Sequence, residues 1–282
     1  MHAVDPDKIF EGTIVIVAPH MDDETLACGG LISQLTHKER IHILYATDGT
    51  RSPAPIIPGD YVSSDLGEVR VKEAIAAMKF LGLHEENLHF LRLPEGQLRK
   101  NMATLKRLLW ELIEAIKPNH IFIPFRYDRH LDHLTVNHVI LEGQRQEKYR
   151  TQIMEYFVYH RWRLLIKKDI RSYIKPNCLL VLDISEVAYQ KRIALDYYES
   201  QTKIYYPWQT RPILTSQLLD EECQNPEYFL FHSPSLPDAA VFTNAVLWIK
   251  VVHRIEPVVK DLKYLSGAFL KRVFDKYVHA AG

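Results

Sequence analysis

Short apolar runs alternate with longer amphipathic segments along most of the chain. The apolar runs, many of them β-branched, predict buried strands over residues 13–18, 41–46, 88–91, 120–124, 154–159 and 179–183. The segments with apolar positions at helical spacing predict helices over residues 24–35, 68–81, 102–116, 132–144 and 186–199. Strands that alternate with helices imply an α/β protein whose mostly parallel sheet is covered on both faces.

The domain expected from this pattern is a Rossmann-like three-layer α/β/α fold. It spans residues 1–282 as one catalytic domain, with a core over about 12–202 and a C-terminal helical extension over about 203–282. From Val241 to Tyr277 the extension is apolar and basic. It could pack on its own domain, form the surface of a homo-oligomer or contact a membrane. Packing is favoured, because amphipathic helices usually bury one face in their own protein.

Composition narrows the functional classes. Lys+Arg and Asp+Glu number 35 each, and this balance argues against a nucleic-acid binder. Hydrophobic residues at 47% are enough for a large core. The three cysteines, Cys28, Cys178 and Cys223, are far apart, so neither a disulfide framework nor a thiolate zinc site is expected, and a cytoplasmic location is the default. The sequence has no apolar run that predicts a signal peptide or a transmembrane segment.

The first group of reactive residues is the sequence PHMDDE at 19–24, where a strand is expected to turn into a helix. An aspartate pair in such a turn could simply cap the helix and interact favourably with its dipole. Capping does not require an imidazole directly before the pair, so His20 favours a functional interpretation.

The second group is DRHLDH at 128–133, also directly after a predicted strand. His130 and His133 are three residues apart and therefore lie close together on a helical turn. An H-x-x-H pair alone is weak support for a metal site. Both groups, however, follow strands of one parallel sheet and can meet at its carboxyl edge, where ligands of such folds bind.

Together the two groups supply imidazoles and carboxylates without thiolates. Two histidines, one aspartate and a water are typical of a catalytic zinc site rather than a structural one. A further carboxylate beside the ion could serve as general base.

These residues resemble the LmbE-like, or PIG-L, family of metal-dependent N-acetylglucosaminyl deacetylases. The family patterns Pro-His-Pro-Asp-Asp-Glu and His-Pro-Asp-His are similar to PHMDDE and to HLDH at 130–133, with Met21 and Leu131 in place of the prolines. The resemblance spans about residues 12–202. Its supporting motifs are RVKE at 70–73, LG at 81–82, LDIS at 182–185, KRIAL at 191–195 and ESQ at 199–201.

The resemblance implies a role for each matching residue. His20, Asp23 and His133 would bind one Zn²⁺ per chain, although another divalent ion such as iron is compatible with them. Asp22 would be the general base, and His130, as an imidazolium, would face the tetrahedral intermediate. Asp132 would support the ligands, and Arg70 would contact the sugar. A surface ion pair with a nearby glutamate is an equally good interpretation of Arg70.

The predicted function is therefore hydrolytic deacetylation of an N-acetyl amino sugar or glycoconjugate, yielding acetate and a free amine. Either Asp22 or His130 could protonate the leaving amine. The alternative is an amidase of the same fold that acts on another N-acyl glycoside or on an amino-acid conjugate. A catalytically silent binding protein is disfavoured because no motif residue is lost. A nucleotide-binding protein is disfavoured because no glycine-rich phosphate motif follows the first strand.

Overall fold

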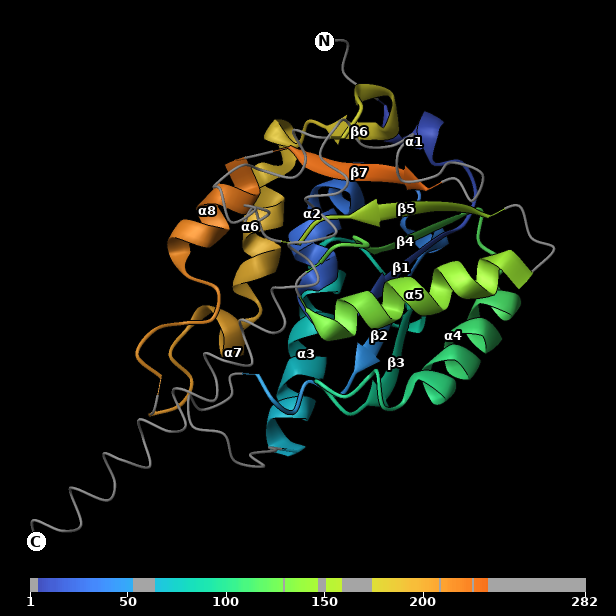
Figure 1. Cartoon of the computed structure of the whole chain (residues 1–282). Helices are drawn as coiled ribbons and strands as arrows, with labels where there is room; N and C mark the ends of the chain where they lie inside the picture. Colours follow the sequence, from blue (N-terminus) through green and yellow to red (C-terminus); the bar gives the residue numbers. More distant parts are fainter. Residues whose placement is uncertain are drawn as a thin grey trace, which may run out of the picture.

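The computed structural model describes residues 5–52, 64–128, 130–146, 151–158, 174–207, 209–224 and 226–232. Within these ranges, the strands form one seven-stranded sheet in the order β3-β2-β1-β4-β5-β7-β6 (Figure 1). The strands are β1 (Ile14–Ala18), β2 (Ile41–Thr47), β3 (Leu88–Leu93), β4 (His120–Pro124), β5 (Gln152–Tyr156), β6 (Leu179–Leu182) and β7 (Glu227–His232). Strands β1 to β5 pair in parallel, whereas β7 is antiparallel to both β5 and β6.

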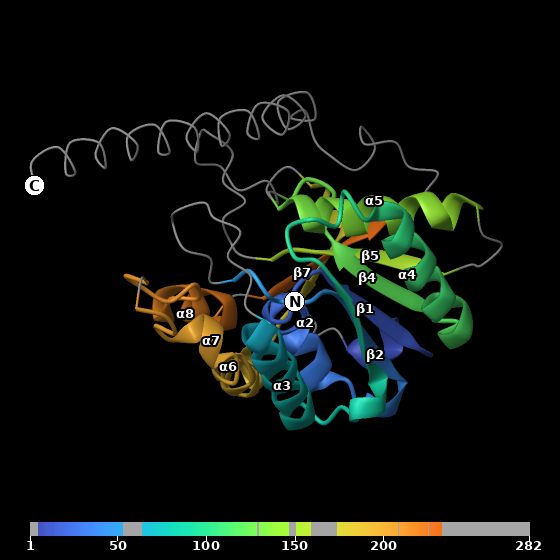
Figure 2. The ribbon, with the colours of Figure 1, turned by 90° about the horizontal axis from the view of Figure 1, so that it is seen from below.

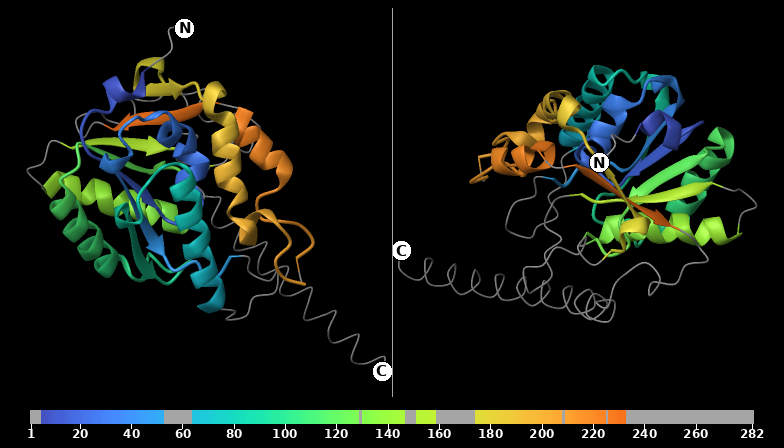
Figure 3. Two further views of the ribbon diagram at one scale, coloured as in Figure 1. Left: turned by 180° about the vertical axis from the view of Figure 1, so that it is seen from behind. Right: turned by 90° about the horizontal axis from the view of Figure 1, so that it is seen from above.

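Helices cover both faces of this sheet. They are α1 (Pro6–Ile9), α2 (Asp23–Gln34), α3 (Ser64–Phe80), α4 (Met102–Ile116), α5 (Leu131–Gln146), α6 (Ala188–Asp196), α7 (Glu199–Thr202) and α8 (Ser216–Gln224). Short 3-10 turns precede several elements, over Lys38–Arg40, Glu85–Asn87, Pro176–Cys178 and Ser185–Val187. Figures 2 and 3 show α4 and α5 on one side of the sheet, and α2, α3, α6 and α8 on the other.

Strand β1 shows why helices pack on both faces of the sheet. All five of its side chains are buried, so it reads as a continuous apolar run, as expected for a strand covered on both faces. Ile14 and Ile16 pack in the cluster that includes residues of α2, α3, α6 and α8. Val15 and Val17 pack in the second cluster, with residues of α4 and α5. Successive strand residues point to opposite faces, so one strand belongs to both cores.

The three-layer α/β fold with a mostly parallel sheet is as predicted, but the core extends further along the chain than the sequence suggested. Strand β7 lies within the stretch assigned to the C-terminal extension and makes two ladders, so the sheet continues to His232 instead of ending near residue 202. Strand β7 begins at Glu227, which is buried and paired with Lys191 at 2.8 Å. The helix expected between Val241 and Tyr277 lies outside the described residues.

No helix in the described part of the chain is long and apolar enough to cross a bilayer. Cys28, Cys178 and Cys223 are all buried and free.

The strand order places a crevice at one edge of the sheet. Strand β1 lies between β2 and β4, and the chain proceeds outward from it in both directions. The carboxyl ends of β1 and β4 are therefore neighbours at the point where the strand order reverses, which is where open α/β sheets bind ligands. The two reactive sequence groups follow these two strands.

Candidate metal centre and catalytic pocket

The turn between β1 and α2 carries three of the predicted site residues. His20, Asp22 and Asp23 are all buried there. Asp22 has φ 145° and ψ −26°, a backbone conformation that a residue with a side chain adopts at a cost of about 1–3 kcal/mol. Although Asp22 occupies the N-cap position of α2, its side chain makes no capping hydrogen bond. Capping therefore does not explain this aspartate.

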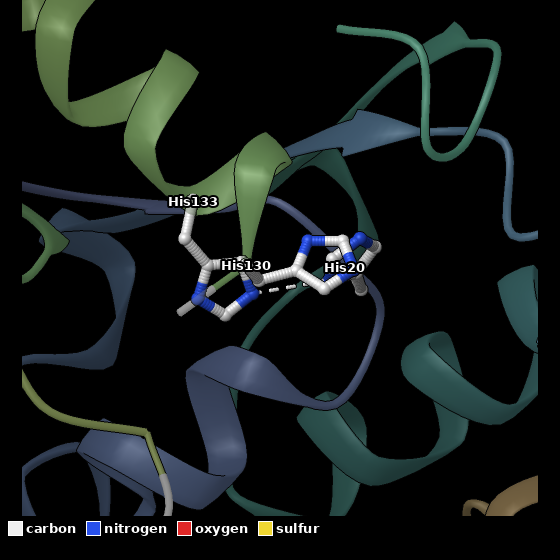
Figure 4. A group of neighbouring side chains, drawn as sticks. All are labelled: His20, His130 and His133. Atoms are coloured by element: carbon white, nitrogen blue, oxygen red, sulfur yellow. Dashed lines mark hydrogen bonds between the residues drawn. The ribbon is translucent and has the colours of Figure 1, made fainter. Parts of the chain in front are cut away.

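His20, Asp23 and His133 bring three donor atoms into a compact triangle. His20 Nδ1 lies 3.1 Å from Asp23 Oδ2, His133 Nε2 lies 3.2 Å from the same oxygen, and the two ring nitrogens are 3.2 Å apart. Figure 4 shows His20 and His133 facing each other across this gap. A tetrahedral zinc shell with bonds of about 2.1 Å separates its donors by about 3.4 Å. The donor set and its spacing therefore fit a small divalent ion.

The other ring nitrogen of each histidine is held by a carboxylate. His133 Nδ1 lies 2.8 Å from Asp128 Oδ2, and His20 Nε2 lies 3.4 Å from Asp132 Oδ2. Such partners orient a metal-binding imidazole and fix which nitrogen is free to bind. Asp132 is itself anchored, because it accepts backbone hydrogen bonds from Gly96 and Leu98.

His130 joins this group from the rim. Its ring lies 4.6 Å from that of His20 in an edge-to-face arrangement, and 5.1 Å from that of His133. The nearest nitrogens of His20, His130 and His133 lie within 4.8 Å of one another, so three imidazoles form an alternative ligand set. His130 is exposed whereas Asp23 is buried, and the shorter donor distances involve Asp23.

Burial and close charges shift the protonation of these groups. Burial raises the pKa of Asp22 to about 8. Burial alone would raise the pKa of Asp23, but His133 and His20 hold it well below its usual range. Burial would lower the pKa of His20, but hydrogen bonds to Asp132 and Asp23 raise it to about 9. Desolvation and the neighbouring His20 and His133 lower the pKa of His130 to about 3.

Arg70 reaches the same site from α3. Its Nη2 donates to the carbonyl oxygen of Met21 at 2.8 Å and lies 3.6 Å from Asp22 Oδ2, while Nη1 lies 3.5 Å from Glu95 Oε1. The side chain is only 1% exposed, so the interpretation of Arg70 as a surface ion pair is wrong. Within the described chain, Nε and Nη1 are buried and have no hydrogen-bond partner.

The site opens into a cavity of about 310 Å³. All of its lining residues except Ile213 have polar or charged side chains, and they are His20, Asp22, Asp23, Ser52, Arg70, Glu95, Asp128, His130, His133, Gln201 and Ile213. The sequence did not assign roles to Ser52, Glu95, Asp128, Gln201 or Ile213. Glu95 follows β3, so its place at the same sheet edge was a usable signal. Ser52 and Ile213 lie in irregular segments and carried none.

Comparison with solved structures finds the same fold in proteins of low sequence identity. N,N'-diacetylchitobiose deacetylase from Pyrococcus horikoshii is 18% identical, with a TM-score of 0.55 over 81% of this chain and 86% of that one. The zinc-inhibited form of teicoplanin deacetylase Orf2 is 13% identical, with a TM-score of 0.58 over 79% of this chain and 100% of that one.

The fold alone does not determine the reaction. The 4-carboxy-2-hydroxymuconate hydratase GalB of Pseudomonas putida KT2440 is 15% identical, with a TM-score of 0.56 over 80% of this chain and 98% of that one. The sequence is more specific, because a family model described as PIG-L, GlcNAc-PI de-N-acetylase, matches residues 15–143. That range contains both histidine-rich motifs and all the residues that form the donor triangle. Over residues 15–143 the chain therefore resembles the PIG-L, or LmbE-like, family.

Proposed function

We propose that this protein is a metal-dependent hydrolase that removes the acetyl group from an N-acetylated amino sugar or glycoconjugate. The observation that carries the proposal is the donor triangle of His20, Asp23 and His133 beside the carboxylate of Asp22, at the base of a polar cavity. A single ion bound there would leave a position open toward the cavity, which is typical of catalytic sites.

The triangle would hold Zn²⁺, or another divalent ion such as iron. When bound, the ion would lower the pKa of a coordinated water to about 7 and polarise the substrate carbonyl. Asp128 and Asp132 keep the two imidazoles oriented for binding.

Asp22 would act as the general base. Its carboxylate lines the cavity next to Asp23 and, as a member of no donor pair in the triangle, is free to accept a proton from the attacking water. Burial raises the pKa of Asp22 to about 8, and an acid with a pKa near the working pH both accepts and returns a proton readily. Arg70, 3.6 Å away, favours the charged form that a base needs.

His130 would stabilise the oxyanion of the tetrahedral intermediate. It lies at the exposed edge of the site and lines the cavity. Because the pKa of His130 is lowered to about 3, its ring is neutral until a negative charge develops beside it. An imidazolium would form there only by taking the proton that Asp22 has removed from the attacking water. A donor of this kind contributes about 3–4 kcal/mol in comparable sites. Either His130 or protonated Asp22 would then deliver a proton to the leaving amine.

The cavity suits a polyhydroxylated substrate, since Arg70, Glu95 and Gln201 supply donors and acceptors along its wall. The second candidate is an amidase that acts on another N-acyl glycoside or on an amino-acid conjugate. Ile213, 41% exposed, also lines the cavity and offers an apolar contact beyond a sugar ring. The proposal includes one catalytic domain over residues 1–282 and a cytoplasmic location, both of which rest on the sequence.

A metal analysis followed by an acetate-release screen tests the proposal. The purified protein should hold about one divalent ion per chain, and chelation should abolish acetate release. The screen should compare N-acetyl amino sugars, their glycosides and N-acetylated amino acids, each with and without added Zn²⁺ or Fe²⁺. Release from the N-acetyl amino sugars or their glycosides supports the first candidate, and release mainly from N-acetylated amino acids supports the second. Full activity in a metal-free protein would contradict both.

A further inference from the structure

The peptide bond between Met21 and Asp22 is held on both sides by side chains from other elements. Arg70 of α3 donates from Nη2 to the Met21 carbonyl at 2.8 Å. On the other side, the backbone N–H of Asp22 donates to Glu24 Oε2 at 3.1 Å. The Asp22 carbonyl is also used, since it accepts from the backbone N–H groups of Thr25 at 3.1 Å and Leu26 at 2.9 Å. The backbone of Asp22 therefore cannot turn without breaking one of these bonds.

Glu24 is in turn held by its neighbour Thr25 and by Tyr198, which lies far away in the sequence. Its Oε1 accepts hydrogen bonds from the hydroxyls of Tyr198 and of Thr25, the latter at 2.9 Å. Glu24 and Tyr198 are both fully buried, and neither lines the cavity. Tyr198 stands directly before α7, and its backbone carbonyl accepts from Gln201, a cavity residue. The support for the β1–α2 turn thus comes from the C-terminal helices.

Arg70 on one side, and Glu24 with Tyr198 on the other, form a clamp on the Met21–Asp22 peptide. The clamp acts on the strained residue of the site. Asp22 has φ 145°, a value that residues with a side chain rarely adopt, so other interactions must maintain it. The direction of a short aspartate side chain follows directly from its backbone. Holding the Met21–Asp22 peptide therefore aims the Asp22 carboxylate at the cavity and keeps it out of the N-capping position.

We infer that Glu24, oriented by Tyr198, is a positioning residue that holds the catalytic base Asp22 in its working orientation, with Arg70 as the opposing half of the clamp. The inference rests on the proposed function for its catalytic consequence. Its structural part, the maintenance of the Asp22 conformation, can be measured whether or not the chain hydrolyses amides.

The experiment compares Glu24→Ala, Glu24→Gln and Tyr198→Phe with Tyr156→Phe. Tyr156 is the matched control, because it is equally buried but donates its hydroxyl to the carbonyl of Val17 in β1 at 2.8 Å instead of to Glu24. For each protein the crystal structure gives the φ of Asp22, and kinetics with metal analysis give kcat, KM and metal content.

Glu24→Ala should move Asp22 out of the positive-φ region and lower kcat about 10²-fold, with KM changed by less than about 3-fold and metal content retained. Glu24→Gln, which keeps an acceptor oxygen, should recover most of the loss, and Tyr198→Phe should lower kcat about 5- to 10-fold. Tyr156→Phe should leave kcat unchanged. If Glu24→Ala is insoluble, Glu24→Gln and Tyr198→Phe carry the same comparison.

If the φ of Asp22 is unchanged in Glu24→Ala, the clamp does not hold this residue and the inference is overturned. If Glu24→Ala is insoluble, an unchanged φ in Tyr198→Phe has the same consequence. A moved Asp22 with unchanged kcat would overturn the positioning role together with the assignment of Asp22 as base. If the wild-type protein releases no acetate from any substrate, the proposed function fails. The φ of Asp22 in the variants then decides the clamp alone.

Discussion

The two loops that build the site are held in different ways. The β1–α2 turn, residues 19–24, is buried, and its conformation depends on Arg70 and Tyr198 from distant parts of the chain. The β4–α5 loop carries His130 and leads into the first turn of α5, which carries His133. Around His130 the bonds are short-range, and His130 is exposed.

In the second loop, Asp128 is the organising residue. Its backbone N–H donates to the Phe125 carbonyl at 3.0 Å, Oδ1 accepts from the N–H of His130 at 2.8 Å, and Oδ2 faces His133. The loop is also tied to the sheet through Arg126, whose backbone N–H and Nε donate to Glu155 of β5 at 2.7 and 2.9 Å. The bonds around His130 itself are local, whereas the β1–α2 turn is held by side chains from distant parts of the chain. We therefore expect the turn to fix metal and base, and the loop to follow the changing charge of the substrate.

The largest expected effect comes from the one metal ligand that follows the loop. His133→Ala removes a corner of the donor triangle and should strip the ion or weaken its binding so far that turnover is lost. His138→Ala is the matched control, because His138 lies on the same helix with a side chain 63% exposed. Metal content after dialysis measures the difference. Full occupancy and turnover in His133→Ala would show that the ligand set is wrong.

Substitution of His130, the exposed residue of the loop, should lower kcat without changing the metal content. His130→Ala removes the group that would face the oxyanion, so kcat should fall about 10²–10³-fold while KM changes little and the ion stays bound. Steady-state kinetics with metal analysis check this. Loss of the metal would instead make His130 a ligand, and wild-type kcat would remove it from the mechanism.

The buried turn should make stability depend on pH once the ion is removed. The pKa of His20 is raised to about 9 from an ordinary value of 6.5, so the folded state binds the proton more tightly than the unfolded state. The tighter proton binding adds about 1–3 kcal/mol to the free energy of unfolding. This stabilisation is fully present below pH 6.5 and is lost as the pH rises through about 9. Urea unfolding of chelator-treated protein between pH 6 and 9.5 should show that decline, and His20→Gln should flatten it. Equal slopes for the two proteins would contradict the raised pKa.

A smaller loss of metal affinity should follow from changing Asp128, which orients the metal ligand His133. Asp128→Asn removes the charge that orients His133 and should lower metal affinity about 10- to 100-fold. Asp183→Asn is a close control, because Asp183 also accepts the backbone N–H two residues on, at 2.9 Å from Ser185, but lies far from the site on the surface. Titration with Zn²⁺ compares the two variants, and indistinguishable affinities would show that Asp128 is not needed.

The fold was largely predictable because its signals are local. The segment 102–116 and the strand 120–124 were predicted to the residue, since each shows a clear period and ends at a proline or a polar turn. Strand β7 was missed because its apolar run, Tyr228–Phe231, is short and begins beside a buried carboxylate, Glu227, which is held by the distant Lys191. Such a contact cannot be read from neighbouring residues.

The candidate site also contains residues that could be predicted from the sequence and residues that could not. His20, Asp22, Asp23, His130 and His133 stand in two short motifs after two strands, and parallel topology brings those strand ends together. The residues that support them do not share a motif. Tyr198 reaches Glu24 across 174 residues of sequence, and Arg70 reaches Met21 across 49. Spacing rules describe neighbours on one element, so they do not find partners of this kind.

The central claim is that the adjacent aspartates of the β1–α2 turn divide the work, Asp23 binding the ion and Asp22 moving the proton. The most direct measurement is metal content and acetate release in Asp22→Asn and Asp23→Asn, prepared and assayed side by side. Asp23→Asn should lose most of its metal. Asp22→Asn should keep the ion at wild-type occupancy but lose most turnover, because an amide cannot accept the proton of the attacking water. Equal losses of metal in both variants, or substantial turnover in Asp22→Asn, would contradict the account.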